Sequence, residues 1–327
     1  ATIEEQAEER GPQAVFATAL GKPRPPRTRP KPTPSARQYG SAMILQPTDW
    51  QAQMRAHEEA ANEYLSRYRH PGSYHPVYDF LFEYYPVRPS HLRRWHPGVG
   101  VTLAGEDVPH AEWRFYHRTS EGITLDADAF LESRGGTVRY VLKLLEKTTR
   151  NPIQFDCFGL HEWAMVYHTD TPRHDLPLRL GVEGTNEVVD KHRIKCTHYD
   201  AFRFFTAPAR PLNLTVLTRD DQPDHDQAGC VHATMDLYKW AWKLGPLVPG
   251  ELFLDTFRLA VAARTLDMEA SPYDCREWGF GIVPIETPEG KSEYVRRQRA
   301  LSDAAAPLRA RLVSQIRAVL PATMKNH

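Results

Sequence analysis

The chain has 327 residues and a mass of 37.4 kDa, with 41 basic and 41 acidic side chains. Because 41% of its residues are hydrophobic and 10% aromatic, it can bury a sizeable core, which excludes a wholly disordered protein. A formal net charge of zero argues against a general nucleic-acid coat or a membrane-surface protein, although it is compatible with a local basic patch. No apolar run reaches the length of a membrane span, and the first residues do not resemble a signal peptide.

The cysteines also restrict the class of protein. The four residues are far apart and none forms a Cys-x-x-Cys pair, so neither a disulfide scaffold nor a zinc ribbon fits. We therefore expect free thiols and a cytoplasmic location. The four are Cys157, Cys196, Cys230 and Cys275.

Residues 1–46 are expected to form an extended or disordered tail rich in proline and arginine. Within it, the run 22–37 carries six basic residues and no acidic one, and its prolines favour an extended, solvated conformation. Such a segment is either a cationic arm for nucleic acid or an acidic partner, or a solvated linker. Both interpretations remain open from the sequence.

Residues 47–327 are expected to form a single globular domain of the mainly α class, with a minor β element. Helices are predicted where apolar residues recur every three or four positions, and strands where they alternate. The predicted helices cover residues 50–68, 76–85, 90–95, 126–134, 137–150, 235–244, 251–268 and 308–320, and a β-hairpin pairs 98–103 with 112–117.

Several residues mark where these elements begin and end. Thr48 or Asp49 can cap the first helix, and Asp126 can cap the helix 126–134. Gly135 and Gly136 are expected to separate that helix from 137–150, whose buried stripe is predicted at Val138, Val141, Leu142 and Leu145. Pro307 is expected to open the last helix. The stretch 150–230 has no clear periodicity, which is typical of functional loops.

Common catalytic motifs are absent, including the P-loop, the dinucleotide-binding glycine motif, the zincin motif and the nucleophile elbow. Instead, histidines and carboxylates occur in three aromatic segments, 158–165, 196–205 and 229–239. In the third, His232, Asp236, Lys239 and Lys243 would form one polar stripe of a helix. Charged residues in such surroundings are costly unless they are paired or used.

Imidazole and carboxylate together suit zinc, iron or manganese, so we predict a divalent metal site in an enzyme. The spacing alone does not show that the three segments converge, and each histidine could equally be structural. The candidate ligands are His161, Glu162, His198, His232 and Asp236, with Asp200 as a further carboxylate.

The predicted reaction is hydrolytic or oxygen-dependent, on a small-molecule or anionic substrate. His232, Asp236, Lys239 and Tyr199 are the candidate catalytic residues, and Tyr238 is an alternative proton donor to Tyr199. Substrate contacts are expected from Arg203, and from Arg88 and Tyr85 in the arginine- and tyrosine-rich segment 75–96, which could bind an anion or stack on bases. The alternative to an enzyme is an interaction protein that docks onto a partner through its tail.

Long motifs also suggest a family. CFGLHEWAMVY (157–167), THYDAFRFFT (197–206), HATMDLYKWAWKLGPL (232–247) and LDMEASPYD (266–274) resemble a group of actinobacterial proteins known as 3-methyladenine DNA glycosylases. The resemblance implies excision of alkylated purines after base flipping into an aromatic pocket, with a carboxylate that assists the attack of water. The segment 96–100 is similar to the hairpin of helix-hairpin-helix glycosylases. The catalytic block of that family is missing, and Asp126 is the nearest carboxylate.

Overall fold

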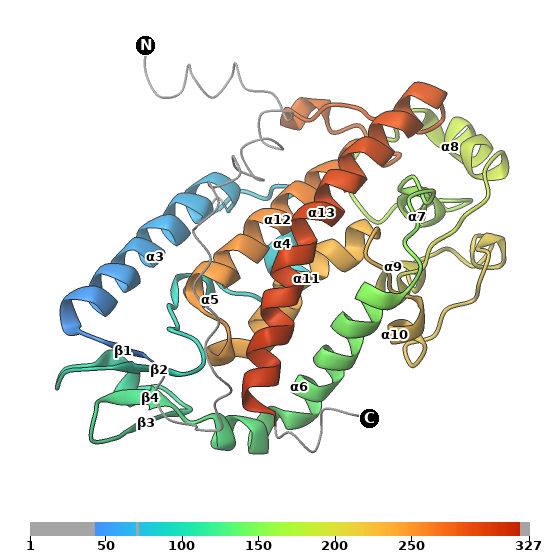
Figure 1. Ribbon diagram of the computed structural model, residues 1–327. Coiled ribbons are helices and arrows are strands. Elements are labelled where there is room, and N and C mark those ends of the chain that lie inside the picture. The colour runs from blue at the N-terminus through green and yellow to red at the C-terminus, as the bar shows by residue number, and fades with distance from the viewer. Residues whose placement is uncertain (1–42, 70–71, 321–327) are drawn as a thin grey trace, which may run out of the picture.

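The computed structural model describes residues 43–69 and 72–320. These residues form a mainly helical fold with one small sheet, as predicted (Figure 1). The predicted tail lies outside the described residues, except for 43–46. No helix in the described ranges is both long enough and apolar enough to cross a membrane.

Four helices build the core. Helix α11 (Val231–Leu244) lies in the centre and contacts α6 (Ala127–Arg150), α12 (Gly250–Glu269) and α13 (Pro288–Val319) (Figure 1). Of its 14 residues, 12 are buried, as are 17 of the 20 residues of α12. Helices buried on every side have no solvent face, so each polar residue on them needs a partner inside the protein. Of the predicted polar stripe, His232, Asp236 and Lys239 are buried, whereas Lys243 is exposed.

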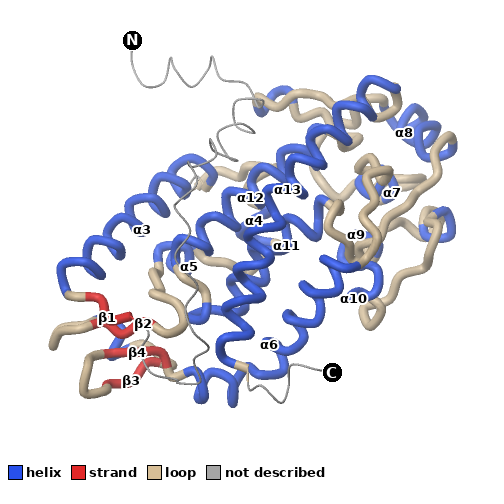
Figure 2. Tube along the Cα trace, in the orientation of Figure 1, coloured by secondary structure: helices blue, strands red, loops and turns tan. Residues whose placement is uncertain are grey.

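The sheet lies at one end of the helices and has four short strands (Figure 2). Its order is β1 (Met43–Leu45), β2 (Val101–Leu103), β4 (Ile123–Leu125) and β3 (Tyr116–Arg118). Strands β1 and β2 are parallel, and the other two pairs are antiparallel. The predicted hairpin is thus wrong: β4 lies between its two strands, and residues 43–45, assigned to the tail, pair with β2.

The remaining elements cover the core. Helix α3 begins at Pro47, and its N-cap Gln46 makes no side-chain cap bond, so the predicted caps Thr48 and Asp49 are wrong. The stretch 150–230 contains four short helices between loops. The bounds are α3 Pro47–Tyr68, α4 Phe80–Glu83, α5 Pro89–Arg93, α7 Leu160–Ala164, α8 Gly181–Asp190, α9 Tyr199–Phe202 and α10 Gln222–His225, with 3₁₀ turns at Pro109–Glu112, Arg210–Leu212, Gly245–Leu247 and Arg276–Trp278.

Helix α6 corrects the prediction of a break at Gly135 and Gly136. Asp126 caps it as predicted, since its side chain accepts a hydrogen bond from the Ala129 amide, and the helix then continues through both glycines. Each glycine costs about 1 kcal/mol relative to alanine, which a buried face can offset. That face comprises Val138, Val141, Leu144 and Leu145, whereas Leu142 is only half-buried.

Helix α13 likewise continues through Pro307, which was expected to open it. A proline inside a helix removes one hydrogen bond and costs about 3 kcal/mol. Leu301, Ala305 and Leu312 on both sides of it are buried, so packing against α12, α11 and α6 holds the helix together. The predicted helix 76–85 is also shorter than expected, since only α4 is regular.

The burial of His110 is expected to make the stability of the protein depend on pH. Burial lowers the pKa of His110 to about 4, although its ring bonds the Trp95 carbonyl. Below pH 6.5 the unfolded chain binds a proton that the folded protein does not bind until about pH 4, so stability falls through this window. The free energy of unfolding, measured with urea, falls between pH 7.5 and pH 5. We expect this decrease to be about 2 kcal/mol smaller in the variant His110→Gln than in the wild type. An equal reduction in the exposed-site control His117→Gln would contradict this.

Candidate metal centre and its neighbouring ion pairs

The segment before α7 turns the chain so that His161 and Glu162 point into the core. Phe158 and Gly159 both have positive φ, 49° and 70°, directly before the helix. Glycine adopts this conformation freely, whereas it costs a residue such as Phe158 about 1–3 kcal/mol, and such strain is common near functional sites. The turn buries every residue of α7.

Four potential ligands from three helices meet in what we call the first cluster. It comprises His161 and Glu162 of α7, His232 in the first turn of α11 and Asp267 near the end of α12, with ligand atoms within 4.8 Å of one another. His161 Nε2 lies 2.8 Å from Asp267 Oδ1, and His232 Nε2 lies 3.9 Å from Asp267 Oδ2. All four side chains are buried.

Arg264, one turn before Asp267 on α12, is the cation of this cluster. Its Nη1 lies 2.9 Å from Asp267 Oδ2 and 3.6 Å from Glu162 Oε1. Burial alone would raise the pKa of Asp267, but His232, His161 and Arg264 lower it, so Asp267 is ionised. Burial and the charge of Asp267 raise the pKa of Glu162. The Arg264 guanidinium therefore faces two carboxylates and lies closer to Asp267. Glu162 has no close positive partner of its own among the described residues.

Two buried atoms of the first cluster make no hydrogen bond within the described part of the chain. They are Glu162 Oε2 and His232 Nδ1. Burial lowers the pKa of His232 far below its usual value, so its ring is neutral and keeps a free lone pair. Tetrahedral ligands about 2.0–2.2 Å from one ion lie about 3.3–3.6 Å apart, so ligand atoms of the cluster as far as 4.8 Å from one another would have to approach by about 1 Å. Its residues fit a divalent metal.

A second cluster lies beside the first and comprises His198, Asp200 and Asp236. The His198 ring is stacked on the His232 ring, with 5.4 Å between centroids and 13° between planes. His198 Nδ1 lies 2.9 Å from Asp226 Oδ1, and its Nε2 lies 3.5 Å from Asp236 Oδ2. The two clusters are thus in direct contact through the stacked rings of His198 and His232.

Lys239 neutralises the second cluster from within. Its ammonium lies 2.5 Å from Asp236 Oδ2 and 3.0 Å from Asp200 Oδ2. Burial would lower the pKa of Lys239, but these two carboxylates raise it. Burial also disfavours charged His198, but Asp226 and Asp236 outweigh it and raise the pKa of His198. Two buried atoms of the second cluster, His198 Nε2 and Asp200 Oδ1, also make no hydrogen bond among the described residues, but this cluster holds its own cation, Lys239, and so has less need of a metal.

A small cavity of ≈ 10 Å³ touches both clusters, through Glu162, His232 and Asp200. That volume suits about one water molecule. Arg173 also lines it, and the guanidinium groups of Arg173 and Arg203 lie 3.7 and 4.3 Å from the centroid of the Phe204 ring. Both arginines are exposed, so the outer side of the cavity is cationic.

Of the other predicted site residues, one contacts the second cluster and three lie elsewhere. The Tyr85 hydroxyl donates to Asp236 Oδ1 at 2.8 Å and is buried, so Tyr85 belongs to the second cluster rather than to a substrate surface. Tyr199 begins α9, but its ring contacts Arg219 at the surface. Tyr238 is buried, without a hydrogen bond to its hydroxyl among the described residues. Arg88 is exposed, with its backbone amide bonded to His91, away from both clusters.

Three residues of the site were not among the candidates. Asp267 and Arg264 lie in a helix that looks like ordinary core, and Asp226 lies in the loop before α11. The detectable signal was an arginine and an aspartate, three residues apart, in the mostly apolar run 259–268, because such residues are rarely fully buried without partners.

The cysteines and the carboxylate suggested by the glycosylase resemblance lie in ordinary surroundings. Burial raises the pKa of Cys196 to about 12 and that of Cys230 well above its usual range, so neither thiol is an activated nucleophile. Asp126 caps α6 and lies 3.6 Å from His117. The segment after residues 96–100 is strand β2, not a helix.

The chain matches no protein-family model, no curated protein and no solved structure.

Proposed function

We propose that this protein is a metal-dependent enzyme whose divalent ion is held by His161, Glu162, His232 and Asp267. The observation that carries the proposal is the pair of buried atoms without hydrogen bonds, Glu162 Oε2 and His232 Nδ1, in a cluster of four metal-ligand side chains. A buried carboxylate oxygen without a partner costs about 1–3 kcal/mol or more, and a cation removes this cost. Zinc, iron and manganese all suit two imidazoles and two carboxylates.

Such an ion would supply a polarised water or an open coordination position, which serves hydrolysis or oxygen-dependent chemistry. The surrounding residues favour hydrolysis. Asp226 and Asp236 raise the pKa of His198, which stacks on His232, so a group suited to donate a proton lies directly beside the proposed centre. Arg173 and Arg203, on the outer side of the cavity, would attract an anionic substrate. Substrate entry requires this side to open, since the cavity suits only about one water.

The protein as purified is expected to contain about one equivalent of zinc, iron or manganese by elemental analysis. His232→Ala should lose it, because this substitution removes a ligand from the first cluster. His198→Ala is the matched control: it removes an equally buried histidine from the second cluster, where Lys239 already serves as the cation, and should retain the metal. No metal after reconstitution, or equal loss in both variants, would make the first cluster a purely structural network.

Two earlier predictions stay untested beside this proposal. The glycosylase activity that the resemblance implies is checked by release of 3-methyladenine from alkylated DNA without metal. A role of residues 1–46 in binding nucleic acid or a protein partner concerns a segment almost wholly outside the described residues. A cytoplasmic location belongs to the proposal as well, and the free state of all four cysteines supports it.

A further inference from the structure

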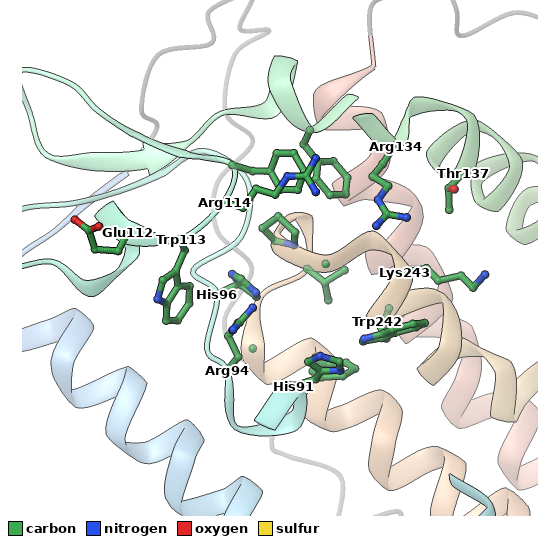
Figure 3. A pocket seen from close by; sticks show the side chains of 18 residues that line it. His91, Arg94, His96, Glu112, Trp113, Arg114, Arg134, Thr137, Trp242 and Lys243 are labelled. Carbon is green, nitrogen blue, oxygen red and sulfur yellow. The ribbon is translucent and has the colours of Figure 1, made fainter. Parts of the chain in front are cut away.

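A larger cavity of ≈ 550 Å³ lies away from both clusters. Its wall comes from four segments: residues 91–96 at the end of α5 and just beyond it, residues 112–115, the first turns of α6, and the stretch from the end of α11 to the start of α12 (Figure 3). Small-molecule sites usually measure about 300–1,000 Å³, so this cavity has the size of a cofactor or metabolite site.

The cavity is strongly cationic. Arg94, Arg114, Arg134 and Lys243 line it, against the single carboxylate of Glu112 (Figure 3). Across residues 43–69 and 72–320, none of these four cations has an ion-pair partner within 4 Å. Four cations from three parts of the fold around one cavity repel one another, and an anion between them removes this repulsion.

Aromatic rings give the cavity flat apolar walls and hold the arginines in place. The Arg94 guanidinium lies 5.2 Å from the centroid of the Trp113 ring, and that of Arg114 lies 4.4 Å from the Phe115 ring. A guanidinium stacked on a ring keeps its N–H edge available for oxyanions, although one N–H of Arg114 already donates to Ser133 Oγ at 3.1 Å. Trp242, whose ring lies 6.0 Å from that of His91, adds a second indole to the lining.

The loop that carries two of these groups is strained. Phe115 has φ of 71°, a conformation that costs a residue with a side chain about 1–3 kcal/mol. Its ring packs edge-on against Phe130 at 5.1 Å, and its carbonyl accepts the Asp126 amide at 2.8 Å. These contacts keep the loop against α6, where Arg114 and Arg134 line the same cavity.

From the arginines and the indole rings we propose that the cavity binds a nucleoside phosphate, with the base against the indole walls and the phosphates on Arg94, Arg114 and Arg134. The site is separate from the proposed metal centre. Lys243 follows His232 by 11 residues on α11, which corresponds to about 16 Å along the helix axis. The proposal therefore stands whether or not the first cluster holds a metal.

Titration with ADP, followed by calorimetry and tryptophan fluorescence, tests the site. Saturable binding is expected, with adenosine and inorganic pyrophosphate each at least about tenfold weaker, because each lacks one half of the recognition. Arg114→Gln and Arg134→Gln should each raise the dissociation constant about tenfold or more, as expected for charge-assisted hydrogen bonds. Arg139→Gln, an exposed arginine on the same helix α6 that does not line the cavity, should leave it unchanged.

Several results would overturn the proposal. One is the absence of saturable ADP binding at millimolar concentration. Another is pyrophosphate binding as tightly as ADP, which would indicate an anion site without a base pocket. A third is equal weakening by Arg139→Gln, which would indicate general electrostatic attraction. The variant His232→Ala is expected to bind ADP like the wild type, so this outcome is independent of the metal proposal.

Discussion

Replacing Glu269 by leucine is expected to lower the free energy of unfolding by about 3–5 kcal/mol, because it leaves a buried guanidinium without its carboxylate. Glu269 ends α12, and its Oε2 lies 2.5 Å from Arg297 Nη1 on α13, with side-chain exposures of 1% and 5%. Its other oxygen accepts the Gly281 amide. For a domain of this size the loss corresponds to about 10 °C in melting temperature, measured by calorimetry or urea unfolding.

Two variants serve as controls for this prediction. Glu269→Leu combined with Arg297→Met should recover most of the loss, since replacing both members of a buried pair by apolar groups is often neutral. Glu293→Leu breaks the neighbouring pair with Arg296, whose side chains are 38% and 66% exposed, and should cost at most about 1 kcal/mol. Similar losses for Glu269→Leu and Glu293→Leu would contradict the argument from burial.

Lys239→Ala is expected to destabilise the protein by about 3–5 kcal/mol and to make its stability depend on added metal. The substitution leaves Asp236 and Asp200 facing each other without the ammonium between them. The space it opens is bounded by His198, Asp200 and Asp236, all metal-ligand types. Mn²⁺ or Zn²⁺ should therefore raise the melting temperature of this variant by more than that of the wild type, and occupancy at 100 times the dissociation constant restores about 2.7 kcal/mol.

Lys239→Met is the matched variant for this experiment. Methionine removes the same charge but fills the space, so the variant should be destabilised to a similar degree without extra stabilisation by metal. Equal responses of the alanine and methionine variants to metal would show that the ammonium does not occupy the position of a cation.

The fold class was predictable because periodicity survives in the helices that pack on one face. Helix α6 shows the limit: its buried stripe was visible, but whether Gly135 and Gly136 break it depends on packing against α13 and α10, which local sequence does not contain. Pro307 is the same case in α13. The prediction of the short strands was wrong for a related reason. A three-residue strand such as β4 has too few residues for alternation to be recognised.

The site was predictable in its residue types and not in its grouping. His161, His198 and His232 were identified from their aromatic surroundings, and their rings do lie together, with centroids 4.4 and 5.4 Å from that of His232. The five predicted ligands separate into two clusters, because α7 and α9 approach α11 at successive turns. Asp267 could not be predicted as a partner of His161, since 106 residues separate them.

That separation has a consequence for how the protein folds. The bond between His161 and Asp267 closes a loop of 106 residues, and the entropy of closing so long a loop must be offset by the contacts that it brings together. During synthesis, α7 is made long before α12. His161 and Glu162 can therefore contact Asp267 and Arg264 only after α12 has also been made. The four side chains of the first cluster therefore come together only once α7, α11 and α12 have packed against one another.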